Sequence, residues 1–137
     1  MKYLLLLAIS AIIFIFMDLL WLGVIAKSFY RARLGFILSD KVNWAAAVIF
    51  YFIYCAGVLW FAVLPSLENG EWHTALINGC LLGLLCYATY DLTNMATIAK
   101  WPLQITLIDI AWGAFITGTV SVSTHLVAVN LLGFGKN

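Results

Sequence analysis

Residues 3–25, YLLLLAISAIIFIFMDLLWLGVI, form an apolar run whose single charged residue is Asp18. A bilayer core about 30 Å thick is crossed by a helix of about 20 apolar residues, so this run is long enough to span a membrane. It is too long for a secretory signal, it contains an acid, and no cleavage site follows it. Three similar runs follow, and the predicted spans are residues 3–25, 43–64, 74–98 and 103–132.

The composition fits a chain that lies mostly in lipid. Of its 137 residues, 65% are hydrophobic and only 9% are charged, whereas a soluble domain has about 25% charged residues. The sequence therefore predicts an all-α integral membrane protein with one domain, residues 1–137, folded as a four-helix bundle. Because every connection is short, neighbouring helices should be antiparallel. The net charge of +1 makes the lipid bilayer, and not nucleic acid, the expected partner.

The loops mark where each span ends. Residues 26–42 are basic, and Tyr30, Leu34, Ile37 and Leu38 repeat at helical spacing, which is the pattern of a short helix lying in the membrane interface. Chance periodicity in a short loop explains the same spacing. Pro65 and the polar residues 68–70 should end the second span at Leu64.

The basic residues predict the orientation. The first and third loops hold five of the seven Lys and Arg residues, and the second loop holds none. Since basic loops stay in the cytoplasm, we expect a multi-pass protein of a bacterial cytoplasmic (inner) membrane with both termini outside.

Three acids interrupt the apolar spans: Asp18, Asp91 and Asp109. A carboxylate in hydrocarbon costs about 2.5–3.5 kcal/mol on insertion scales, so each should face the bundle interior. Each acid lies roughly seven residues from the cytoplasmic end of its helix, a depth of about 10 Å. The sequence therefore predicts one layer of three carboxyls. Close carboxyls in a low dielectric should not all be ionised.

Polar and aromatic residues accompany these acids. Asp18 and Trp21 share a helical face, as do Asp109 and Trp112, and antiparallel packing should put the two tryptophans on opposite sides of the acid layer. We expect a polar, aromatic-walled cavity near the cytoplasmic side that binds a ligand or protons. Its candidate residues are Asp18, Trp21, Tyr87, Tyr90, Asp91, Thr93, Asn94, Thr106, Asp109 and Trp112.

Other side chains offer no cofactor motif. Cys55, Cys80 and Cys86 form no CxxC pair, and all three lie in apolar runs, so a thiol relay is disfavoured. His73 and His125 lie far from the acids along their helices, so we expect no histidine–carboxylate metal site. An all-oxygen site for a hard cation stays open.

Small residues on the last two spans predict close helix packing. Gly79 and Gly83 lie four residues apart on one span, and Gly113, Thr117 and Ser121 repeat the step on the next. Such residues let helix backbones approach one another in lipid. Packing within the chain is the favoured interpretation, and a homodimer seam is the alternative.

Two segments carry a resemblance: FMDLLWLG, residues 16–23, and YDLTNMATIAKWPLQITLIDIAWGAFITG, residues 90–118. With these Asp-x-x-Trp, Tyr-Asp-Leu-Thr-Asn, Trp-Pro and Asp-x-Ala-Trp-Gly motifs, the whole chain resembles an uncharacterised bacterial family of small predicted membrane proteins, a domain of unknown function. The resemblance implies a shared four-helix membrane fold and no established activity.

Three functions are compatible with this sequence. The leading hypothesis is binding or transport of a small molecule, a cation or protons at the acid layer. The first alternative is an intramembrane enzyme acting on a lipid or isoprenoid, with one Asp as acid or base. The second is a structural or accessory subunit whose acids hold helices together.

Overall fold

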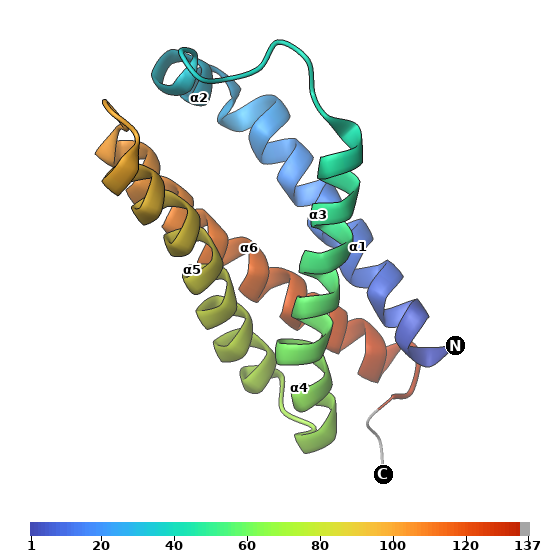
Figure 1. Ribbon diagram of the computed structural model, residues 1–137. Helices are drawn as coiled ribbons and strands as arrows, with labels where there is room; N and C mark the ends of the chain where they lie inside the picture. Colours follow the sequence, from blue (N-terminus) through green and yellow to red (C-terminus); the bar gives the residue numbers. More distant parts are fainter. Residues whose placement is uncertain (135–137) are drawn as a thin grey trace.

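Four long helices make up the protein in the computed structural model, which describes residues 1–134. All four are long and apolar enough to cross a membrane, and neighbouring helices run antiparallel (Figure 1). The predicted all-α, four-helix membrane fold is confirmed. The elements are α1 (Lys2–Leu20) with the π-helical turn η1 (Trp21–Ile25), α2 (Lys27–Leu34), α3 (Trp44–Val58), the π-helical turn η2 (Leu59–Val63), α4 (Leu64–Asn69), α5 (Trp72–Thr97) and α6 (Leu103–Asn130).

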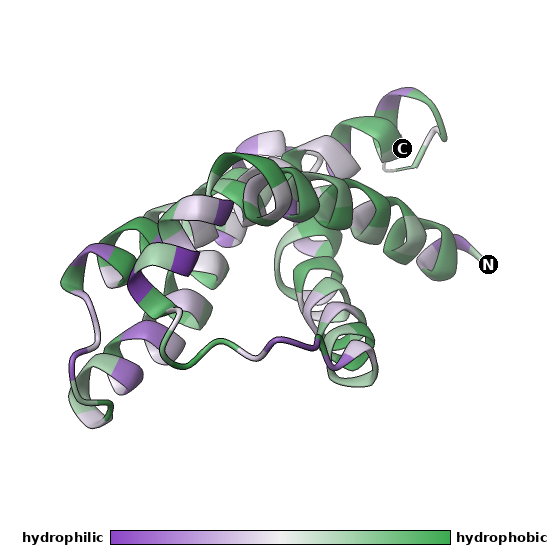
Figure 2. Ribbon diagram, turned by 90° about the horizontal axis from the view of Figure 1, so that it is seen from above, coloured by the Kyte–Doolittle hydropathy of each residue, from purple (hydrophilic) through white to green (hydrophobic). Residues whose placement is uncertain are grey.

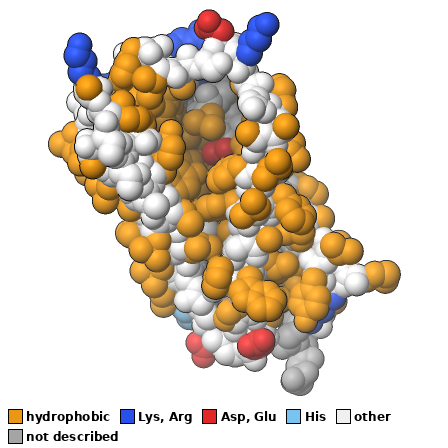
Figure 3. All heavy atoms as spheres, in the orientation of Figure 1, with side chains coloured by type: hydrophobic (Ala, Val, Ile, Leu, Met, Phe, Trp, Pro, Cys, Tyr) orange, Lys and Arg blue, Asp and Glu red, His pale blue; other side chains and the backbone are white. Residues whose placement is uncertain are grey.

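The two ends of the bundle differ in charge. Figure 2 shows hydrophobic residues along the helices and hydrophilic residues gathered mainly at helix ends and loops. In Figure 3 the Lys and Arg side chains cluster at the end where α2 and the α5–α6 turn lie. We call this the basic end, and its cationic residues are Lys27, Arg31, Arg33, Lys41 and Lys100.

Helices α5 and α6 form the tightest pair. A Cβ at Gly79 would lie 2.8 Å from the carbonyl oxygen of Thr117, and a Cβ at Gly83 would overlap the carbonyl of Gly113. Since backbone cannot yield as a flexible side chain can, only glycine fits at these two positions. The small residues seen in the sequence are therefore used for packing inside the chain.

Helices α1 and α3 complete the bundle on the other side. Phe14 of α1 packs on Tyr54 of α3 with ring centroids 5.0 Å apart, and both belong to the main apolar core. Among residues 1–134, α5 packs mainly on α6, and the first half of α5 also contacts η2 and α4. Helices α3 and α5 therefore diverge toward the basic end (Figure 1). This divergence leaves room for a cavity between them.

The second span passes Pro65, where the sequence predicted its end, and continues to Asn69. Proline lacks the N–H that would bond to the carbonyl four residues earlier, that of Phe61. The Asn78 side chain donates to the Phe61 carbonyl instead, at 3.1 Å, and the wide turn η2 lies just before the proline. An outside donor thus lets the helix continue.

The first loop contains the predicted short helix, but α2 ends at Leu34. Ile37 and Leu38, which the spacing placed on the same face, lie beyond it and are exposed. Leu34 is buried with Trp101 and Ile105 in a small apolar cluster. This contact fixes α2 against the start of α6, across the basic end of the bundle.

Candidate functional site

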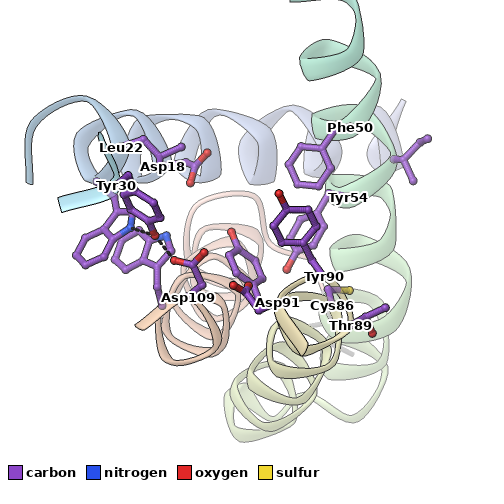
Figure 4. Close-up of a pocket in the computed structure, with 14 residues that line it drawn as sticks. Asp18, Leu22, Tyr30, Phe50, Tyr54, Cys86, Thr89, Tyr90, Asp91 and Asp109 are labelled. Atoms are coloured by element: carbon purple, nitrogen blue, oxygen red, sulfur yellow. Dashed lines mark hydrogen bonds between the residues drawn. The ribbon is translucent and has the colours of Figure 1, made fainter. Parts of the chain in front are cut away.

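A cavity of about 640 Å³ lies between the helices in the half of the bundle nearer the basic end (Figure 4). Its lining is predominantly apolar and aromatic, and it comes from all four spans and from α2. The lining residues are Asp18, Trp21, Leu22, Tyr30, Phe50, Ile53, Tyr54, Cys86, Tyr87, Thr89, Tyr90, Asp91, Asp109 and Trp112.

Asp91 and Asp109 form a carboxyl pair in this cavity. They come from the adjacent helices α5 and α6 and lie beside one another (Figure 4), close enough to interact electrostatically. Asp91 is fully buried, and among residues 1–134 the neighbour within hydrogen-bonding reach of its oxygens is the Asp109 carboxyl, with which it can bond only while one of the two is protonated. Buried polar groups nearly always have a partner, so Asp91 and the Trp112 indole N–H, which is also buried without a partner among the described residues, are the exceptional groups of the site.

Asp109, in contrast, has a donor from α2. The Tyr30 hydroxyl donates to Asp109 and accepts a hydrogen bond from the Trp21 indole N–H at 3.2 Å. Burial, and then the hydrogen bond to Asp109, raise the pKa of the Tyr30 phenol, so it stays a donor at any physiological pH. One tyrosine therefore links α2 to α6 and to the end of the first span.

Asp18 has a separate partner. Tyr51 of α3 donates to its carboxyl at 2.7 Å. Farther from the basic end, Ser10 of the same helix bonds to Thr124 of α6 at 3.1 Å, which joins α1 to α6.

All three predicted carboxyls line this one cavity. Asp18 is also close enough to Asp109 to interact with it electrostatically. That the three carboxyls form a single layer stays a prediction.

The two tryptophans lie together, and not on opposite sides of the acids. Trp21 and Trp112 stack with ring centroids 4.4 Å apart and planes 10° from parallel. Their positions follow the same α1–α6 register as Ser10 and Thr124. The stacked pair thus joins η1 to α6 in the wall of the cavity.

Tyrosines and a phenylalanine form the rest of the wall. The Tyr87 ring rests against Gly113, where a Cβ would overlap it, and it meets Tyr54 edge-on at 6.5 Å between centroids. Phe50 lies 5.4 Å from Tyr54. The Tyr54 hydroxyl is already bonded to Thr117, at 2.8 Å, so Tyr54 offers the cavity mainly its ring.

Three of the predicted site residues lie outside the cavity. Thr93 is exposed and its hydroxyl donates to the Tyr90 carbonyl at 3.0 Å. Thr106 is buried, and it accepts from the Trp101 indole at 3.0 Å. Asn94 is half-buried and does not line the cavity. These residues were predicted because they share a depth or a helical face with the acids, and neither is enough to bring a side chain into the cavity.

The sequence analysis missed Tyr30, Tyr51 and Tyr54. Tyr51 and Tyr54 carry hydroxyl groups in an otherwise apolar span, and a buried tyrosine hydroxyl needs a partner, which is a usable signal. Tyr30 had no such signal, because only the fold of α2 over the bundle brings it to Asp109. Among the described residues, no group of three His, Cys, Asp or Glu is arranged to hold a metal ion.

The family model described as "Predicted membrane protein (DUF2177)" matches residues 3–126 of this chain. The chain belongs to this family. The match includes all three intramembrane aspartates, both stacked tryptophans and α2, so every residue that lines the cavity lies in the matched range. No curated protein matches the chain. No solved structure matches it either.

Proposed function

We propose that this protein binds a small molecule through an ammonium or other hydrogen-bond-donating group, which Asp91 and Asp109 hold. Transport of that molecule is the broader form of the same proposal. The observation that carries the proposal is the fully buried Asp91 carboxyl, which no donor among residues 1–134 reaches apart from the second carboxyl beside it, Asp109. A carboxyl that serves only to join helices would be expected to have a donor, as Asp18 and Asp109 do. Asp91 is left for a ligand.

The walls support a cationic or donor group over an anionic one. Two carboxyls supply acceptors, and the faces of Trp, Tyr and Phe rings attract cations when they are within about 6 Å. The cavity has no lysine, arginine or histidine in its lining, so no cationic side chain would balance the charge of an anion there. Its volume of about 640 Å³ falls in the range of about 300–1,000 Å³ that small-molecule sites occupy.

Binding of butylammonium to the purified protein tests the proposal, with butyrate as the matched anion of the same shape. We expect butylammonium to change the fluorescence of the stacked tryptophans and butyrate to have no effect. Asp91→Asn removes the charge but keeps the shape, and it should weaken butylammonium binding by about tenfold or more. The proposal would be refuted if Asp91→Asn binds butylammonium as tightly as the wild type does, or if the wild type does not bind butylammonium. A melting curve of Asp91→Asn checks that the variant is folded.

We also infer that the basic end faces the cytoplasm of a bacterial inner membrane, with both termini outside. The inference is supported by the cluster of Lys and Arg at that end and by the tendency of basic loops to stay inside. A cysteine at Asn69 should react with a membrane-impermeant maleimide in intact cells, and one at Asp40 should react only after the membrane is opened. The reverse labelling pattern would invert the orientation.

A further inference from the structure

The cavity opens sideways, between α3 and α5. In Figure 3 a hollow near the basic end lies between the hydrophobic side chains of these two helices, and an acidic side chain is visible inside it. Exposed lining residues stand on both sides of this opening: Phe50 and Ile53 of α3, at 46% and 64%, and Tyr90 of α5, at 59%. They form the rim of the opening together with Cys86.

This rim lies at the depth of the hydrocarbon. Phe50 and Ile53 follow the start of their span, Trp44, by about 9 and 14 Å of helix. Tyr90 and Cys86 precede the end of theirs, Thr97, by about 10 and 17 Å. An opening at that depth, with an apolar rim, faces acyl chains and not water.

The two features together define the class of the ligand. We propose that it is a single-chain amphiphile with an ammonium head, which enters from the bilayer between α3 and α5. Its head binds Asp91 and Asp109, and its chain runs out past Phe50 and Ile53 into the lipid. This inference rests on the proposed function and adds the chain and the route to it.

The test uses alkylammonium ions of increasing length and a chain-brominated dodecylammonium as a contact quencher. The protein is placed in nanodiscs as Trp44→Phe/Trp60→Phe/Trp72→Phe, which removes the exposed tryptophans. Of the three that remain, Trp21 and Trp112 line the cavity and report on it, while Trp101 is buried outside its lining. We expect saturable quenching that unbrominated dodecylammonium competes away, and binding that tightens from butyl to octyl to dodecyl. Asp91→Asn and Asp109→Asn should each weaken it by about tenfold.

Two variants on adjacent residues of α5 test the route. Cys86→Phe enlarges a residue on the rim and should reduce quenching by the brominated amine. Leu85→Phe is the matched control, because Leu85 is 62% exposed but does not line the cavity, and it should behave as the wild type.

The outcomes separate the two proposals. If butylammonium binds as tightly as dodecylammonium and Cys86→Phe equals Leu85→Phe, the chain and the lateral route are wrong while the proposed function stands. If no amine depends on either aspartate, both proposals fall. Quenching that rises linearly with the concentration of the brominated amine and is unchanged in Asp91→Asn would come only from chains in the surrounding lipid. That result would also overturn the inference.

Discussion

Tyr30 is the residue that closes the site at its basic end. Its hydroxyl is a hydrogen-bond donor to Asp109, and it accepts from Trp21. Because burial and the hydrogen bond to Asp109 raise its pKa, the phenol keeps its proton and this donation does not titrate near neutrality. Asp109 is therefore a positioned carboxyl, whereas no such donor reaches its neighbour Asp91 among the described residues.

Tyr30→Phe should remove this link with little change in volume. We expect a loss of about 1 kcal/mol of stability, since hydrogen bonds between membrane helices average about 0.6 kcal/mol and reach about 1.7. Thermal denaturation in detergent measures it, and the loss should be the same at neutral and at mildly alkaline pH. Tyr3→Phe is the control, because Tyr3 is 63% exposed. A Tyr30→Phe melting curve that matches the control would show that the link contributes nothing.

At the residue scale, the acids were the part of the site that could be predicted. An ionisable group in an apolar span has few acceptable places, so Asp18, Asp91 and Asp109 had to face the interior. Their partners could not be predicted, since Tyr51 and Tyr30 come from other segments and reach the acids only through the fold. Thr93 and Asn94 do not line the cavity, although Asn94, three residues after Asp91, shares its helical face.

At the scale of the elements, helix length and apolarity were enough to predict four spans. The ends were harder: the second span passes Pro65 because a distant side chain, that of Asn78, satisfies the freed carbonyl of Phe61. The lengths of the helices also say little about register. The Ser10–Thr124 contact and the tryptophan stack together set the register of α1 against α6.

Helices α5 and α6 act as a rigid unit against which the others are placed. Their close approach at Gly79 and Gly83 holds Asp91 and Asp109 at one level, whereas α3 leans away from α5 (Figure 1). The small residues that the sequence analysis noted are thus what keeps the carboxyl pair together. The splay of α3, which makes the cavity and its opening, had no signal in the sequence.

At the scale of the whole molecule, the polar groups are divided between two tasks. Ser10 with Thr124, Tyr54 with Thr117 and Ser66 with His125 pair across helices in the buried core, where unpaired groups would be costly. Near the basic end, Asp91 and the Trp112 indole N–H lack such partners among the described residues. The buried polar groups are therefore paired along much of the bundle, and the exceptions line the cavity.

Labelling with dicyclohexylcarbodiimide tests the central claim, that Asp91 is a carboxyl free to meet a molecule arriving from the bilayer. This apolar reagent adds to a protonated carboxyl, and the adduct rearranges to a stable N-acylurea that intact-mass and peptide spectra locate. Two carboxyls side by side out of water are not both ionised, so the pair offers a reactive proton. We predict a single adduct at Asp91, its absence in Asp91→Asn, and slower labelling when dodecylammonium is present. A wild-type protein that stays unlabelled, or labelling of Asp91 that dodecylammonium does not slow, would contradict the account.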